Sequence, residues 1–102
     1  MNTNTATAVP TPINGVDTDW AGTWVAVGAL GEIHKSTTGG VSWSPVASGT
    51  ASTLYDVTTN RLGFWLATGV GGVAVRSTDN GTNWSTVSTG VGSDLRTVTY
   101  AP

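Results

Sequence analysis

Asp79 lies in the segment STDNGTNW, residues 77–84, where its carboxylate could act as a general acid, a calcium ligand or an acceptor for the backbone of a turn. A calcium loop of the EF-hand type requires several acidic ligands at fixed positions and a distal Glu, which this segment lacks. Asn80-Gly81 favours the positive φ angles of a tight hairpin turn. Short acidic side chains accept hydrogen bonds from backbone N–H groups in such turns. We therefore expect Asp79 to stabilise a turn and to bind no metal.

A second segment, STTGGVSW at residues 36–43, has the same pattern with Thr38 in the place of the acid. A hydroxyl can make similar local hydrogen bonds, although weaker ones. A catalytic acid or a metal ligand would lose its function in such a replacement, whereas a residue that fastens a turn would keep much of it. The pair of segments therefore favours a structural role for both.

The other polar residues show no spacing that is typical of a catalytic or metal site. Glu32, Asp56 and Asp94 do not form the spaced acid pair that glycoside hydrolysis needs. His34 is the only histidine, and we expect it to be packed in a strand or to lie at a sheet edge, not to bind a metal. The chain has no Cys, which excludes disulfides and thiolate sites. We therefore predict that the protein is not an enzyme and holds no cofactor.

The composition indicates one small folded unit preceded by an extended arm. The chain has 102 residues, of which 10% are charged, and a net charge of -2, so it offers no basic surface to a nucleic acid. Residues 1–12 lack the basic and apolar regions of a signal peptide. We interpret them as a flexible N-terminal arm, or as an arm that orders against a partner, and residues 13–102 as the folded unit. No apolar run approaches the ~20 residues of a membrane-spanning helix.

An internal repeat is the strongest signal in the sequence. A shift of 41 residues places residues 18–58 over residues 59–99, and 17 of the 41 aligned pairs are identical. Several Gly residues recur, as do the pairs Trp24 and Trp65, and Trp43 and Trp84. Because chance rarely places the same Trp and Gly residues in step, we interpret the two segments as copies of one structural unit.

Each unit has the pattern of short β-strands separated by turns. Runs rich in Val, Trp, Thr and Leu alternate with clusters of Gly, Ser and Asn, and no window shows the period of a helix. Four strands in about 41 residues is typical of a propeller blade. The strands that we expect are Ile13–Thr18, Trp24–Val27, Glu32–Ser36, Ser42–Val46, Leu54–Thr59, Phe64–Thr68, Val73–Ser77, Asn83–Val87 and Leu95–Tyr100.

The two turn segments resemble a known motif. Residues Ser77, Asp79, Gly81 and Trp84 have the spacing of the Asp box, or bacterial neuraminidase repeat, and residues Ser36, Thr38, Gly40 and Trp43 resemble a degenerate copy. The stretch WVAVGALGEIHKSTTGGVSW is similar to blades of Asp-box propellers such as the photosystem II assembly-factor family. This resemblance covers residues 18–100. It implies a β-propeller in which the box lies on the hairpin between the third and fourth strands of a blade and is structural, remote from ligand sites.

Because Asp-box propellers include sialidases, the resemblance also suggests a glycosidase activity as a hypothesis. Those enzymes use three arginines that grip a carboxylate, a Tyr nucleophile with an acidic partner, and an Asp acid. This chain has three arginines and two tyrosines, but no motif places them together: Arg61, Arg76, Arg96, Tyr55 and Tyr100. A sialidase-like activity is therefore the least favoured function.

Two blades are too few to form a closed propeller, because each blade buries its faces only against neighbours. We expect residues such as Trp24, Val25, Leu66 and Val75 to lie on faces that an isolated pair would leave open to water. Homo-oligomerisation into a ring would cover them. Six blades from a trimer is the favoured number, four or five chains remain open, and the alternative is that the chain is a piece of a longer propeller.

The run Leu95–Tyr100 repeats Leu54–Thr59, which begins the second unit. It could supply the innermost strand of the first blade in the next chain by main-chain hydrogen bonds. Ile13–Thr18 competes for the same place, and the sequence leaves both possibilities open.

Two non-catalytic functions fit these expectations. The first is a structural or interaction module of an extracellular or virion-like assembly, whose partners are copies of itself and other assembly proteins. The second is a lectin with repeated glycan sites around the ring. Trp20, which aligns with Arg61 and so lies outside the repeated pattern, is the candidate to stack on a sugar; its alternative role is to cover a blade edge.

Overall fold

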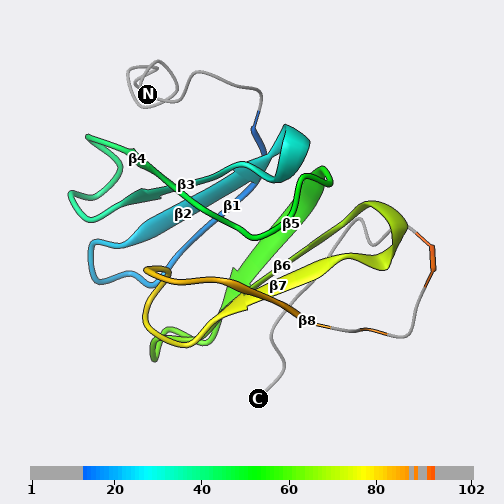
Figure 1. The fold of residues 1–102 in the computed structure, drawn as a ribbon. Coiled ribbons are helices and arrows are strands. Elements are labelled where there is room, and N and C mark those ends of the chain that lie inside the picture. Colours follow the sequence, from blue (N-terminus) through cyan, green and yellow to red (C-terminus); the bar gives the residue numbers. More distant parts are fainter. Residues whose placement is uncertain (1–12, 88, 90–91, 94–102) are drawn as a thin grey trace.

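Two four-stranded antiparallel sheets, joined in sequence, make up the described part of the chain (Figure 1). The computed structural model describes residues 13–87, 89 and 92–93. Blade 1 contains β1 (Ile13–Thr18), β2 (Trp24–Gly28), β3 (Ile33–Ser36) and β4 (Ser44–Val46). Blade 2 contains β5 (Leu54–Thr59), β6 (Trp65–Gly69), β7 (Ala74–Ser77) and β8 (Ser85–Val87). The expected all-β fold with two four-stranded blades is thereby confirmed.

The fourth strand of each blade is shorter than we expected. The predicted runs Ser42–Val46 and Asn83–Val87 lose their first two residues, since the strands begin at Ser44 and Ser85. The backbone N–H groups of Ser42 and Asn83 donate to side chains of the preceding turn instead. The turn motif therefore extends further into each run than hydrophobicity suggests. The predicted strand 95–100 and the predicted arm 1–12 lie outside the described residues.

The hairpins between the second and third strands are short 3-10 turns, η1 (Ala29–Gly31) and η2 (Val70–Gly72). Leu30 and Gly71 occupy the same position of the repeat, and both have a positive φ, 59° and 67° respectively. The expected turn at Asn80-Gly81 also has positive φ angles, 63° and 84°. Both copies thus bend the chain in the same way between the second and third strands, although blade 1 has Leu30 where blade 2 has Gly71.

Each blade has two faces, which we call front and back, because alternate residues of paired strands point to opposite sides of a sheet. In blade 1, the front face carries Val16, Trp24, Ala26, His34 and Ser36, and the back face carries Val25, Val27, Ile33 and Lys35. In blade 2, the corresponding front face carries Val57, Trp65, Ala67, Val75 and Ser77, and the back face carries Leu66, Thr68, Ala74 and Arg76.

The back face of blade 1 packs against the front face of blade 2, and this contact forms the hydrophobic core. Val25 and Val27 from blade 1 lie in one buried cluster with Trp65, Ala67 and Val75 from blade 2. All five side chains are 0% exposed. Burial of apolar surface stabilises by about 25 cal/mol per Å², so this single inter-blade contact is the main source of stability in the described chain.

This arrangement corrects part of our expectation about open faces. Val25 and Val75 are fully buried between the blades, so their predicted exposure in an isolated pair is wrong. Trp24 and Leu66 lie on the two outer faces and are only partly buried. The alternation of residues defines two faces for each blade, but it does not say which face the neighbouring blade covers.

The first strands of the two blades lie side by side (Figure 1). Asn14 Nδ2 donates a hydrogen bond to the backbone oxygen of Leu54 over 3.0 Å, and Asp17 Oδ2 accepts one from the backbone N–H of Thr59 over 3.1 Å. A Cβ atom on Gly15 would come within 2.8 Å of the Asp56 Cα atom. Gly15 is therefore required for the close approach of these strands. Within the described residues, no helix has the length and apolar character needed to cross a membrane.

Candidate binding surface

The turn of blade 2 at residues 77–84, the predicted Asp box, is held by hydrogen bonds within the turn itself. The Ser77 hydroxyl accepts from the backbone N–H groups of Asp79 and Gly81, over 3.3 and 2.8 Å, and donates to Asp79 Oδ1 over 2.7 Å. The Asp79 carboxylate also accepts from the backbone and the side chain of Asn83, over 2.9 and 2.7 Å. Trp84 Nε1 donates to the backbone oxygen of Gly81 over 2.9 Å. These bonds fix the turn and place Trp84 in the core.

The same donors lower the pKa of Asp79 from 3.8 to about 2. The backbone N–H of Asn83 makes the largest contribution, followed by the Asn83 side chain and the Ser77 hydroxyl. A depressed carboxylate pKa means that the ionised form is the one that the fold favours. Such a group is suited to accept hydrogen bonds and poorly suited to donate a proton near neutral pH.

The turn of blade 1 has the same network without the charge. The Ser36 hydroxyl accepts from the backbone N–H groups of Thr38 and Gly40, over 3.2 and 2.9 Å. Thr38 Oγ1 accepts from the backbone N–H of Ser42 over 2.9 Å, and Trp43 Nε1 donates to the backbone oxygen of Gly40 over 3.0 Å. Thr38 therefore makes the central bond that Asp79 makes in blade 2. Both turns use their polar atoms to hold their own backbone.

The loops that follow the first strand of each blade are built alike. Asp19 Oδ1 accepts from the backbone N–H groups of Ala21 and Thr23, over 2.8 and 3.1 Å. Asn60 Oδ1 accepts from the corresponding groups of Leu62 and Phe64, over 2.7 and 3.2 Å. These bonds close each loop on its own backbone, as short polar side chains do in Asx turns.

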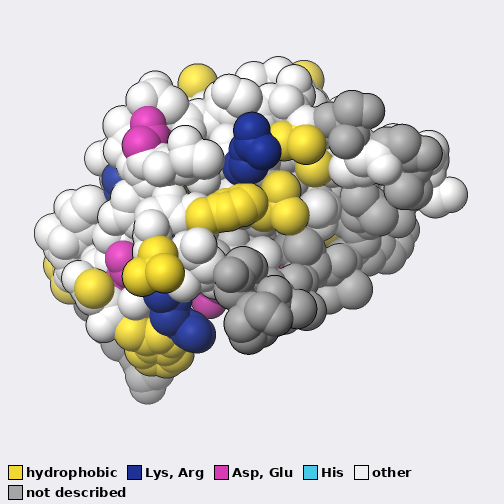
Figure 2. Space-filling model, turned by 90° about the horizontal axis from the view of Figure 1, so that it is seen from below, with side chains coloured by type: hydrophobic (Ala, Val, Ile, Leu, Met, Phe, Trp, Pro, Cys, Tyr) yellow, Lys and Arg dark blue, Asp and Glu magenta, His cyan; other side chains and the backbone are white. Residues whose placement is uncertain are grey.

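Trp20 and Arg61 lie at the tips of these two loops and are equivalent in the repeat. Both have a positive φ, 62° and 65°, and the Arg61 Cζ atom lies 5.9 Å from the centroid of the Trp20 ring. This is within the range of a cation–π contact. Trp20 is 72% exposed and Leu62, beside Arg61, is 87% exposed. In the space-filling view, hydrophobic side chains likewise lie directly against Lys and Arg side chains on the surface (Figure 2). Most of the Trp20 surface is open to solvent in the single chain, and its two predicted roles, stacking on a sugar and covering a blade edge, stay predictions.

The candidate residues of a glycosidase are not gathered at one place. Arg61 lies in the loop after β5, whereas Arg76 lies in β7. Tyr55 lies in β5, and Arg96, Tyr100 and Asp94 fall outside the described residues. Arg61, Arg76 and Tyr55 thus lie on three different segments of blade 2.

His34 is buried and bonded to Glu32, the residue between η1 and β3. Its side chain is 6% exposed, and its Nε2 atom lies 2.9 Å from Glu32 Oε1. In the described part of the chain, no group of three or more His, Cys, Asp or Glu side chains is arranged to hold a metal ion. The geometry agrees with a packed histidine.

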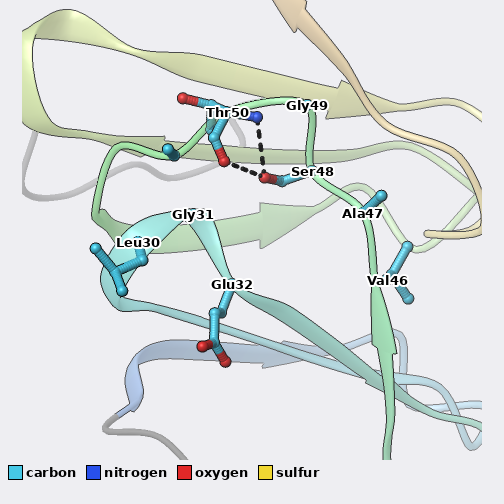
Figure 3. Close-up of a pocket in the computed structure, with 9 residues that line it drawn as sticks. Leu30, Gly31, Glu32, Val46, Ala47, Ser48, Gly49 and Thr50 are labelled. Carbon is cyan, nitrogen blue, oxygen red and sulfur yellow. Dashed lines mark hydrogen bonds between the residues drawn. The ribbon is translucent and has the colours of Figure 1, made fainter.

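A shallow depression, which the sequence did not indicate, lies beside η1 of blade 1 (Figure 3). It has a volume of about 510 Å³ and is lined by residues of η1 and of the loop between β4 and β5. Ser48 Oγ donates to the backbone oxygen of Thr50 over 3.0 Å, and Glu32 is paired with His34. The Ser48 hydroxyl and the Glu32 carboxylate, which line the depression, are thus both bonded to neighbouring groups.

The two meandering sheets place this chain among proteins with β-propeller blades. A solved chain of YCF48, a photosystem II assembly factor with a β-propeller fold, in the structure "YCF48 bound to D1 peptide", matches 93% of this chain with a TM-score of 0.76 and 16% sequence identity. This chain spans 33% of that chain. No family model and no curated protein matches the sequence. The likeness shows the fold, and membership of the Asp-box family stays a prediction.

Proposed function

We propose that this protein is a non-catalytic interaction module that acts as a β-propeller formed by several copies of the chain. The observation that carries the proposal is the unequal burial of equivalent residues. Val57 is 3% exposed on the covered front face of blade 2, whereas its counterpart Val16 is 50% exposed on the outer front face of blade 1. The chain repeats the same interface but covers it only once.

The length of the related solved chain supports three copies in the ring. Since this chain spans 33% of that chain, three copies have about the same length as one complete copy of it. A heterologous contact closes into a ring when the rotation between copies is a simple fraction of a full turn. Three two-blade chains would supply six blades, and four or five chains would supply eight or ten.

The proposal of a non-catalytic role rests on the geometry of the polar groups. Asp79 is bonded to its own turn and has a lowered pKa, so it is not an acid poised near neutral pH. Arg61 contacts Trp20, while Arg76 lies on the outer face of blade 2. The low charge and the Ser, Thr and Gly content support a place in an extracellular or virion-like assembly, where other assembly proteins would be the partners.

Native mass spectrometry of the 102-residue chain tests the ring. We expect a single particle whose mass is three times 10.4 kDa, and a mass four or five times that value would keep the ring and change its size. A folded monomer at micromolar concentration would contradict the proposal.

Glycan binding is the second candidate function, and the exposure of Trp20 favours it. An open aromatic ring can stack on the apolar face of a sugar, and the adjacent Arg61 guanidinium offers hydrogen-bond donors to hydroxyl or carboxylate groups. Copies arranged in a ring would repeat this site and raise the overall affinity.

A glycan array with three proteins tests the lectin. The wild type is expected to bind, Trp20→Ala to lose binding, and Leu62→Ala to retain it. Leu62 is a suitable control because it is even more exposed than Trp20 and lies on the neighbouring loop. Absence of binding by the wild type, or equal loss of binding in both variants, would contradict the lectin function and leave the interaction module as the proposed function.

A further inference from the structure

The contact between the two blades provides a template for the joint between copies. Lys35, on the back face of blade 1, extends across the Asp-box turn of blade 2. Its Cδ atom lies 3.6 Å from the place where a Cβ on Gly81 would be, and its Nζ atom donates to Thr82 Oγ1 over 3.2 Å. Val25 Cγ2 lies 3.4 Å from the same point at Gly81. A back-face cation thus crosses the box turn of the neighbouring blade.

The same positions on the outer faces carry Arg76 and Val41. Arg76 corresponds to Lys35, and Val41 corresponds to Thr82. Arg76 is exposed, and Val41 is 77% exposed although it is apolar. Trp43, the counterpart of the buried Trp84, is only partly buried next to this turn. The blade 1 turn therefore presents apolar surface where the blade 2 turn presents a hydroxyl to Lys35.

This pairing of residue types is chemically complementary. An Arg side chain covers apolar surface with its three methylene groups and places its planar guanidinium over an aromatic ring. Val41 would contact the methylene groups, and Trp43 would receive the guanidinium as a cation–π partner. The same position of the repeat thus has two forms. Inside the chain Lys pairs with Thr, and on the outer faces Arg would pair with Val and Trp.

Two polar residues, one on each outer face, support the same contact between copies. Among the described residues, Thr68 Oγ1 is the one buried side-chain oxygen or nitrogen atom that has no hydrogen-bond partner. Thr68 lies on the outer back face of blade 2 in the position of the core residue Val27, and His34 lies on the outer front face of blade 1 in the position of the core residue Val75. A buried hydroxyl without a partner is costly. Polar residues therefore replace apolar ones on both of the faces that would meet.

We propose that copies of the chain join head to tail through unlike faces, so that the back face of blade 2 covers the front face of blade 1 of the next copy, with Arg76 of one copy packed on Val41 and Trp43 of the other. This inference rests on the ring described above and adds which faces form it. The occupant of each outer face is a second copy of this chain, because the joint continues the blade-to-blade interface that the chain already contains.

Cysteine cross-linking tests the joint, since the wild-type chain has no Cys. Val41→Cys and Arg76→Cys are made as separate proteins, mixed, reassembled and treated with a short bis-maleimide. The mixture is expected to give a covalent dimer on a denaturing gel, whereas each variant alone gives none. The double variant is expected to give a ladder that ends at the number of chains in the ring. Lys35→Cys with Thr82→Cys in one chain is the positive control, because that pair links within the chain.

The outcomes separate the joint from the ring. Dimers from either single variant alone would show that like faces meet and would overturn the proposal. Absence of cross-links in the mixture, while native mass shows that both variants form rings, would also overturn it and leave the ring intact. If the wild type is oligomeric and only Arg76→Cys is monomeric, while Lys35→Cys assembles, Arg76 is required at the joint and the proposal is supported. A monomeric wild type would overturn the ring and the joint together.

Discussion

Blade 1 and blade 2 have the same strand order and nearly the same turns, but they differ in which of their faces is covered. Trp65 and Val57 are 0% and 3% exposed on the front face of blade 2. Their counterparts in blade 1 are Trp24, which is partly buried, and Val16, which is 50% exposed. The difference at these two pairs shows that burial depends on the neighbour of a blade as well as on the residue, since Ala26 and Ser36 are buried as their counterparts Ala67 and Ser77 are.

Removal of the core tryptophan should have the largest effect. Trp65→Ala is expected to destabilise the chain by about 3–5 kcal/mol, as for other large-to-small changes of buried aromatic residues. Trp24→Ala, at the equivalent position, should cost clearly less in a dilute, dissociated chain because Trp24 is partly exposed. Urea unfolding of both variants measures the two values. Equal losses in the dissociated chain would contradict the difference between the faces.

Two glycines with positive φ should differ because only one of them is crowded. A Cβ atom on Gly31 would come within 1.9 Å of the Thr50 backbone oxygen, whereas a Cβ on Gly71 would meet nothing within 4 Å. Gly71→Ala is expected to cost about 1–2 kcal/mol from its left-handed backbone alone. Gly31→Ala should cost more, since the loop that contains Thr50 must also move. Thermal unfolding of the two variants gives the comparison, and a larger loss for Gly71→Ala would contradict it.

Exchange of Asp79 and Thr38 should move the acid sensitivity from one blade to the other. The pKa of Asp79 is lowered to about 2, so its contribution to stability is present above the usual pKa near 4 and is lost as the pH falls toward 2. Asp79→Thr is expected to flatten the stability curve in this interval, and Thr38→Asp to steepen it. Urea midpoints between pH 5 and pH 2 measure both. Identical curves for the wild type and Asp79→Thr would show that the carboxylate does not matter.

The smallest expected effect is at Thr68, where the hydroxyl lacks a partner among the described residues. Thr68→Val installs the residue type that blade 1 has at Val27. In the dissociated chain the change should be neutral or stabilising by up to about 1 kcal/mol, because an unsatisfied hydroxyl is removed. In the assembled ring it should weaken association if the hydroxyl is bonded across the joint. Dilution followed by size-exclusion chromatography measures the second effect, and unchanged dissociation would place Thr68 outside the joint.

The regular parts of the fold could be predicted because the repeat aligns two independent copies of each signal. Leu54–Thr59 has the predicted bounds, and Asn80 and Gly81 have the positive φ angles that their dipeptide favours. The starts of β4 and β8 were misplaced because Ser42 and Asn83 bond to the turn rather than to a strand. A sequence pattern identifies residues that favour strands, but it does not identify the acceptor to which each backbone N–H group donates.

The faces and the candidate site depend on information that one strand does not contain. The alternation around Val25 separates two faces, but the direction in which the next blade stacks decides which one is buried. Trp20 resembles a core aromatic by residue type, yet it lies in a loop closed by Asp19 and is 72% exposed. The proximity of Trp20 and Arg61 follows from the stacking of two blades. In the sequence, the one sign of this proximity is that Trp20 and Arg61 occupy equivalent positions of the repeat.

Hydroxyl-radical footprinting of the undiluted protein tests most directly whether another copy covers the front face of blade 1. Trp20 is the exposed reference and Trp65 the buried one. The oxidation rates of Trp24 and Trp43 are expected to fall to that of Trp65 in the concentrated protein and to rise when the protein is diluted to single chains. Oxidation of Trp24 and Trp43 that stays between the two references at every concentration would contradict the account.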